Sequence, residues 1–222
     1  MITRYGYDVV GVILVVCLIW IAVSWFVVDG RVWKSILIIL PLAVLAFTLY
    51  FFRDPERHAP SGDDLVLAPA DGTVVLIQQT REDEFLRGEA TQISIFMSPL
   101  NVHVNRWPLS GVVRFFRHVP GDYIVAMDEK SSVRNERTLI GLEHAGGKVL
   151  FKQIAGFIAR RIVAPVQVGD TAVAGKRFGM IKFGSRVDVL LPLGTAIAVK
   201  VGDRTVAGES ILARIPPQRT DR

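Results

Sequence analysis

The stretch Val166-Gln-Val-Gly-Asp-Thr-Ala-Val-Ala-Gly175 occurs a second time as Val199-Lys-Val-Gly-Asp-Arg-Thr-Val-Ala-Gly208. Seven of the ten positions are identical, which favours an internal duplication over two independently chosen hairpins. Each copy reads as a short strand, a Gly-Asp turn, a second strand and a glycine, which is the pattern of a β-hairpin. The repeat therefore predicts one β unit that is used twice.

Short apolar runs surround the repeat and continue upstream of it. They are rich in β-branched and aromatic residues, several alternate in polarity, and Gly, Pro or Asp separates them, so we predict strands. The runs are Gly72–Ile77, Gln92–Phe96, Gly111–Phe116, Lys148–Ile154 and Val187–Leu191. No long amphipathic helical pattern follows residue 53. We expect residues 53–222 to form one mainly β domain around one core, with a barrel-sandwich-like fold whose duplicated hairpin is of the lipoyl or biotinyl type.

The first 52 residues differ from the rest, because they hold two long apolar runs. Residues 9–28 are 20 residues without a charge, and residues 35–52 are 18 more. Each run is close to the ~20 residues that a helix needs to cross a bilayer. A cleaved signal peptide is disfavoured, since the first run exceeds the usual apolar region and no small-residue cleavage site follows it. We predict a membrane-associated helical hairpin over residues 1–52.

The formal net charge of +5 does not by itself identify a partner. Basic residues are scattered rather than clustered, so we expect no nucleic acid. Attraction to an anionic lipid surface is the simpler interpretation beside a membrane anchor, although a solvated surface without a partner fits the charge equally well. Arg4 precedes the first apolar run, and Arg53 and Arg57 follow the second, which favours both ends in the cytoplasm. We expect a cell-membrane protein with its β domain on the cytoplasmic face. The single Cys17 leaves no disulfide framework.

Gly184-Ser185 stands between the two copies of the repeat, in Phe183-Gly-Ser-Arg186. A Gly-Ser bond can break itself if the serine oxygen attacks the preceding carbonyl, which glycine makes reachable because it has no Cβ. Elimination and hydrolysis then leave a pyruvoyl group on the new N-terminus. Its ketone can form a Schiff base with a substrate amine and withdraw electrons, as pyridoxal phosphate does. Taken alone, the tripeptide favours an ordinary turn, and the glycines of a Gly-x-Ser-x-Gly hydrolase elbow are missing.

Asp71 and the histidines are the remaining candidates for proton transfer. Asp71 lies in Pro69-Ala-Asp-Gly72. It is either an ordinary turn residue or has a carboxylate that orients a histidine. Strand alternation places His103 on one face with Asn101 and Asn105, where a structural role is the ordinary interpretation. His118 faces either a pocket or solvent. None of the four histidines has metal-ligand spacing, so we expect no metal.

Several motifs, in this order, resemble those of the phosphatidylserine decarboxylases, in their short bacterial branch. The likeness covers nearly the whole chain after residue 50. The segments that carry it are Phe52–Arg57, Pro69–Gly72, Phe96–Arg106, Val119–Asp122, Arg134–Arg137 and Phe183–Ser185.

The resemblance implies a proenzyme and a carboxy-lyase that cuts itself between Gly184 and Ser185. The products would be a β chain, residues 1–184, and an α chain, residues 185–222, which stay together as a heterodimer. Ser185 would become the covalent pyruvoyl cofactor, without pyridoxal phosphate or metal. The substrate would be phosphatidylserine in the bilayer, and the products phosphatidylethanolamine and CO2.

Two departures from the family pattern leave the base for self-cleavage open. The frequent Leu-Gly-Ser-Thr is here Phe-Gly-Ser-Arg, and Arg106 stands where the long branch has a second histidine. His118 and Asp71 are the candidates for that base. His103 is expected to act in decarboxylation, either by reprotonating the α-carbon or by orienting the carboxylate. Arg106 is expected to bind the lipid phosphate, for which its fork of donors is suited.

Two other functions fit parts of the sequence. The repeat and the anchor also suit a membrane-anchored, lipoyl-like adaptor module without catalysis, whose chain would stay intact. A carrier with a modified Lys182 would need that lysine at a hairpin tip, whereas Lys182 reads as part of a strand.

Overall fold

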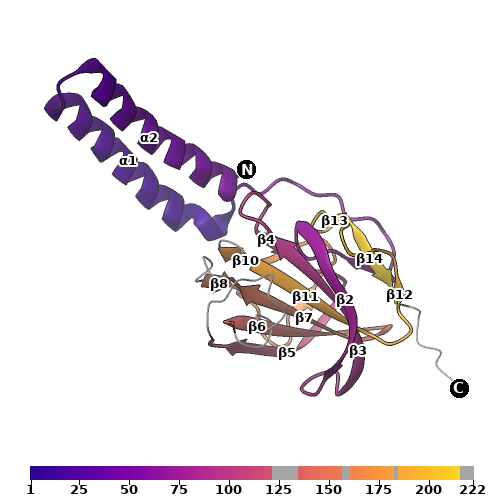
Figure 1. Ribbon diagram of the computed structural model, residues 1–222. Helices are drawn as coiled ribbons and strands as arrows, with labels where there is room; N and C mark the ends of the chain where they lie inside the picture. The colour runs from indigo at the N-terminus through magenta and orange to yellow at the C-terminus, as the bar shows by residue number, and fades with distance from the viewer. Residues whose placement is uncertain (122–134, 157–160, 183–184, 216–222) are drawn as a thin grey trace, which may run out of the picture. The chain divides into compact units, whose positions relative to one another are not determined.

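The computed structural model describes residues 1–121, 135–156, 161–182 and 185–215. Phe183, Gly184, Asp122 and Arg134, which belong to the motifs above, lie outside the described residues. The chain divides into two compact units, Met1–Glu56 and Arg57–Arg222, and each is described by itself (Figure 1).

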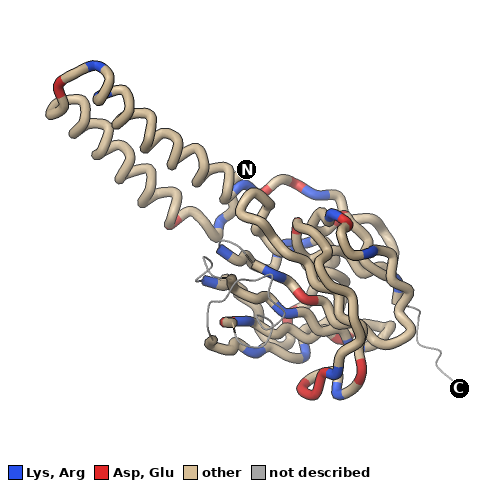
Figure 2. Tube along the Cα trace, in the orientation of Figure 1, with Lys and Arg blue, Asp and Glu red and all other residues tan. Residues whose placement is uncertain are grey.

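The first unit is a pair of helices, which confirms the predicted apolar hairpin. A 3-10 turn, η1 (Arg4–Gly6), leads into α1 (Tyr7–Val27), and α2 (Arg31–Phe51) returns beside it. Both helices are long and apolar enough to cross a membrane. Charged residues lie at the helix ends and in the connection, and the remainder of both helices is uncharged (Figure 2).

Hydrogen bonds close the hairpin at its base and tie the helices together. The Thr3 amide donates to the Phe52 carbonyl (2.9 Å), and the Asp54 amide donates to the Met1 carbonyl (2.7 Å). Within the pair, the Cys17 thiol donates to the Pro41 carbonyl on the facing helix (3.3 Å). Apolar side chains cover most of the outward surface, which suits lipid surroundings better than water.

The second unit is mainly β, as predicted. Its described strands form an eight-stranded sheet, ordered β13-β2-β3-β11-β7-β6-β5-β9, and two three-stranded sheets, ordered β1-β14-β12 and β4-β10-β8. The large sheet is strongly curled (Figure 1). The strands are β1 (Leu65–Leu67), β2 (Gly72–Glu82), β3 (Gly88–Met97), β4 (Val104–Arg106), β5 (Gly111–Val119), β6 (Arg137–His144), β7 (Gly147–Ala155), β8 (Arg161–Val163), β9 (Thr171–Ala172), β10 (Arg177–Lys182), β11 (Ser185–Pro192), β12 (Ala196–Ile197), β13 (Arg204–Thr205) and β14 (Ile211–Arg214).

The two copies of the repeat adopt matching geometry at opposite edges of the large sheet. The first copy adds β9 beside β5, and the second adds β13 beside β2. The turn glycines Gly169 and Gly202 have φ of 100° and 96°, a backbone region that favours glycine. The following aspartates cap equivalent amides: Asp170 accepts from Gln167, and Asp203 accepts from Lys200. The duplication in sequence is thus also a duplication in structure.

The central strand β11 has a different environment on each face. Its odd-numbered residues after Ser185 are Val187, Val189 and Leu191, which join the main hydrophobic core. Leu190 joins a smaller cluster on the opposite face, with Phe85 as its aromatic member. This alternation is that of a strand buried on both sides.

Gly72 opens β2 at a point where the backbone of β3 passes close by. A Cβ there would collide with the Phe96 carbonyl oxygen and lie 2.8 Å from Ile95 Cγ2. Because backbone cannot move aside as a flexible side chain can, Gly72→Ala is expected to lower the free energy of unfolding by about 2–3 kcal/mol. Gly88, which opens β3, has open space around it, so Gly88→Ala is the matched control. Thermal unfolding in detergent compares the two variants, and equal melting temperatures would contradict the expectation.

Candidate active site

Ser185 is the first residue of β11 and is held from both sides. It pairs with Met97 of β3 and with Ala155 of β7, and its exposure is 0%. Its hydroxyl donates to Met97 Sδ at 3.2 Å, and sulfur is only a weak acceptor. The backbone at this position is therefore fixed, while its reactive oxygen lies in a mostly apolar surrounding.

A line of buried polar side chains continues from Ser185 across the neighbouring strands. Asn105 Nδ2 lies 3.9 Å from Met97 Sδ, and Asn105 Oδ1 accepts from Gln153 Nε2 at 2.8 Å. Gln153 Oε1 in turn accepts from the Thr138 hydroxyl at 2.8 Å. Buried polar groups almost always find partners, and these find one another. The sequence motifs do not point to this line, although amide side chains inside apolar strands are the signal from which it could be predicted.

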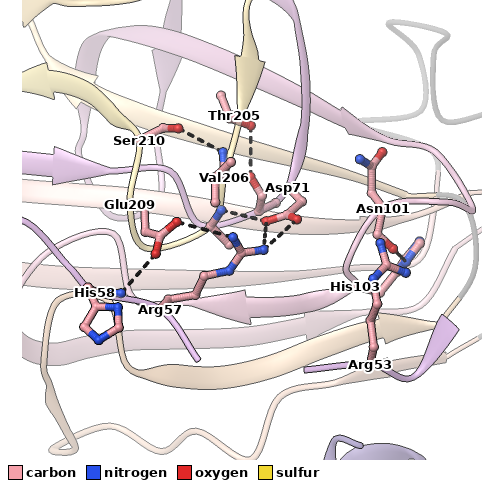
Figure 3. A network of polar contacts seen from close by, with 12 residues as sticks. Arg53, Arg57, His58, Asp71, Asn101, His103, Thr205, Val206, Glu209 and Ser210 are labelled. Atoms are coloured by element: carbon pink, nitrogen blue, oxygen red, sulfur yellow. Dashed lines mark hydrogen bonds and ion pairs between the residues drawn. The ribbon is translucent and has the colours of Figure 1, made fainter. Parts of the chain in front are cut away.

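His103 lies just before β4 and is completely buried. Its Nδ1 is 2.9 Å from the Asn101 carbonyl oxygen (Figure 3). A carbonyl only accepts, so this contact places the proton of the neutral ring on Nδ1 and the lone pair on Nε2. The His103 carbonyl accepts from the Ile181 amide at 3.3 Å. His103 is therefore beside β10, the strand that leads toward Ser185.

Asp71 is held by an arginine. Arg57 Nη2 lies 3.1 and 3.4 Å from its two carboxylate oxygens, and the Ala207 amide donates to it at 2.8 Å. Figure 3 shows the carboxylate turned toward Arg57, whereas the His103 ring points toward Asn101. The contacts of Asp71 thus tie the start of this unit to the second copy of the repeat.

Glu209 extends this ionic group. It contacts Arg57 at 3.3 Å and accepts from the His58 amide at 3.0 Å (Figure 3). The hydrogen bond from the His58 amide, together with the nearby Arg57 charge, holds the pKa of Glu209 below its usual value. Arg57 therefore joins two carboxylates that are far apart in the sequence.

His118 lies on β5, and its side chain is 46% exposed, with Nε2 3.7 Å from Glu136. Strands β6 and β7 separate β5 from β11. Three strand spacings amount to roughly 14 Å along the sheet. At that separation, direct proton transfer between the His118 ring and Ser185 would require the two to come closer together. Between the histidines predicted for the site, the strand positions favour His103.

Arg106 and Lys182 are both buried. Arg106 Nη1 donates to the Gly175 carbonyl at 3.0 Å, which links β4 to the first copy of the repeat. Phosphate binding by Arg106 stays a prediction. Lys182 is the last residue of β10 and pairs with Arg161 of β8, so it occupies a strand as the sequence predicted. Within the described residues, no three His, Cys, Asp or Glu side chains are arranged to hold a metal ion.

The chain matches the family model described as phosphatidylserine decarboxylase over residues 44–213. It is 47% identical over 219 residues to the phosphatidylserine decarboxylase proenzyme of Chlorobium phaeobacteroides, covering 96% of this chain and 99% of the relative. The proenzyme of Salinibacter ruber is 48% identical over 199 residues (88% and 87%). That of Chlorobium phaeovibrioides is 54% identical over 171 residues (77% and 78%). The chain belongs to the phosphatidylserine decarboxylase family and is a decarboxylase, a lyase of phospholipid biosynthesis.

Proposed function

We propose that this chain is a proenzyme that cleaves itself between Gly184 and Ser185 and converts phosphatidylserine into phosphatidylethanolamine and CO2. The observation that carries the proposal is the position of Ser185 as the buried first residue of a central strand. The curated relatives are named proenzymes, which supports processing. The proposed catalytic cofactor is a pyruvoyl group made from Ser185.

The surroundings of Ser185 fit such a group. Strand pairing on both sides fixes the backbone of residue 185, so a ketone at that position would have one orientation. The residues that pair with position 185, Met97 and Ala155, are buried and apolar, which suits a small group without charge. When formed, the pyruvoyl group supplies a ketone that condenses with the substrate amine and withdraws electrons from the α-carbon.

His103 is the proposed proton donor or orienting residue of decarboxylation. Its Nδ1 contact with the Asn101 carbonyl fixes the ring and the tautomer, so Nε2 is the nitrogen that exchanges a proton. Its burial beside β10 keeps bulk water from competing for that proton. The base that assists self-cleavage stays a prediction between Asp71, which Arg57 holds, and His118, which lies three strands from β11.

The two product chains are proposed to stay together after cleavage. Residues 185–222 would contribute β11, β12, β13 and β14, and β11 pairs with β3 and β7 of the larger chain. Strand β14 pairs with β1 in the same way. Cutting one peptide bond before β11 leaves these ladders intact.

The apolar helices are proposed to keep the enzyme at the membrane that holds its substrate. Two helices that can each cross a bilayer suit an enzyme whose substrate is a phospholipid. The basic residues at both ends of the hairpin favour the cytoplasmic face for the β unit.

The test is the intact mass of the purified full-length protein under denaturing conditions, together with release of CO2 from phosphatidylserine in mixed micelles. Two chains that divide at 184/185, with the smaller one blocked by pyruvoyl, and release of CO2 are the expected result. An uncut chain without activity would overturn the proposal and favour an adaptor module. Cleavage without release of CO2 would support self-processing but exclude phosphatidylserine as the substrate.

A further inference from the structure

A fully buried ionic group lies on the face of β11 opposite Ser185. The side chains of Arg186 and Asp188 are 1% and 0% exposed. Arg186 Nε donates to Asp188 Oδ1 at 2.6 Å, and Arg186 Nη2 donates to the Ser94 hydroxyl of β3 at 2.7 Å. Gln92 Nε2 donates to the same hydroxyl at 2.9 Å. Figure 1 shows β11 and β3 near the middle of the large sheet.

Stability is a poor explanation for this group. Taking a guanidinium and a carboxylate out of water is costly, and the attraction between them often does no more than repay that cost relative to apolar side chains. Lys152, directly opposite Asp188 on β7, adds a further charge to this face. Burial lowers the pKa of Lys152, while the charge of Asp188 opposes that shift. A third charged group, partly buried, makes the arrangement harder to explain by stability alone, so the position of the group in the chain becomes the informative feature.

That position is directly after the residue proposed to carry the chemistry. Arg186 follows Ser185, and its backbone pairs with Phe96 on one side and Ile154 on the other. The guanidinium is planar and holds its partners in a fixed fork. Because the Arg186 side chain binds Asp188 on its own strand and Ser94 on the neighbouring strand, it restricts the twist of β11 at residue 186. That twist sets the direction in which residue 185 points.

Cleavage would increase the need for such a grip. Residue 185 would become a chain end, and chain ends fray more easily than strand interiors. The Arg186–Ser94 hydrogen bond would then join the small chain to the large one, one residue from the new end. A displacement of about 1 Å can misalign the reacting groups and lower the rate about 100-fold.

We propose that Arg186, Asp188 and Ser94 form a clamp that positions residue 185, first for self-cleavage and then as the carrier of the reactive ketone. These are positioning residues, since they act through β11 from the opposite face. The catalytic effect of this clamp rests on the proposed function, whereas its ordering of β11 at residues 186–188 does not.

Ser94→Ala tests the clamp in the full-length protein, because it removes the arm to β3 and leaves the Arg186–Asp188 pair intact. The matched control is Thr195→Val, which removes a hydroxyl hydrogen bond to the Pro192 carbonyl at the other end of β11. Ser94→Ala is expected to slow cleavage and lower kcat by about tenfold, with KM within about twofold of wild type. Amide exchange at residues 186–188 is expected to accelerate by about tenfold. Thr195→Val is expected to change none of these.

A second variant guards against a mere folding defect. Arg186→Lys keeps the charge and loses the fork, so it is expected to cleave at a rate between those of wild type and Arg186→Met. Equal cleavage, kcat and exchange in Ser94→Ala and Thr195→Val would overturn the clamp while leaving the proposed function in place. If wild type neither cleaves nor releases CO2, the proposed function fails. Faster exchange at residues 186–188 in Ser94→Ala would then still support the clamp, and unchanged exchange would remove it.

Discussion

Ser185→Ala is expected to leave the chain in one piece and without decarboxylase activity. In the proposed reaction, one oxygen atom attacks the Gly184 carbonyl, and the same residue becomes the ketone. Alanine supplies neither the attacking atom nor the precursor of the cofactor, so activity is expected to fall to the background of the assay. Denaturing mass spectrometry and CO2 release measure the two effects on the same sample.

The fold is expected to survive this change. Among the described residues, the Ser185 hydroxyl donates to a methionine sulfur, a weak acceptor, so its loss is expected to alter the free energy of unfolding by about 1 kcal/mol or less. Ser110→Ala is a suitable control, because it removes a serine hydroxyl that accepts from the Ala174 amide at the surface. Two chains or residual activity in Ser185→Ala would contradict the role of this residue.

His103→Asn is expected to lower kcat for decarboxylation by about 10²–10⁴-fold, the usual contribution of a general acid or base. Asparagine keeps a polar side chain of similar reach but has no titratable nitrogen in place of Nε2. KM for phosphatidylserine is expected to change little, since the lost interaction concerns proton transfer rather than binding. Steady-state kinetics on the processed enzyme provides both constants.

His144→Asn is the matched control for this prediction. The Nδ1 of His144 also lies 2.8 Å from a backbone carbonyl, that of Ser110, but His144 ends β6 at a hairpin. The same substitution there is expected to leave kcat within about twofold of wild type. A His103→Asn enzyme that keeps more than a tenth of the wild-type kcat, on the scale of such contributions, would remove His103 from the chemistry. Intact single chains in His103→Asn would indicate that it is also needed for cleavage.

The repeat shows how far local sequence leads. Each Gly-Asp turn depends on a glycine with positive φ and an aspartate that caps an amide three residues earlier. Such interactions lie within a few residues of one another, so the pattern alone predicts them. The apolar runs of the hairpin are of the same kind, since length and hydropathy decide them.

The partners of the charged residues were less accessible to sequence analysis. Sequence analysis left Asp71 as either a turn residue or a carboxylate beside a histidine, and the structure pairs it with Arg57 and the Ala207 amide. Arg186 lies among strand residues in the sequence, where alternation alone does not tell a solvent-facing position from the buried ionic one that it occupies. Both outcomes depend on which strands become neighbours.

The sequence by itself determined the two apolar helices, the mainly β second unit with its duplicated turn-and-strand segment, and the motifs that place the chain in its family. Only the tertiary structure decided that Ser185 lies between Met97 and Ala155, that Asn105 meets Gln153, and that Arg186 grips Ser94. The physical reason is that helices and turns form through contacts between near neighbours. The pairing and register of distant strands instead depend on closing long loops and burying both faces of one sheet.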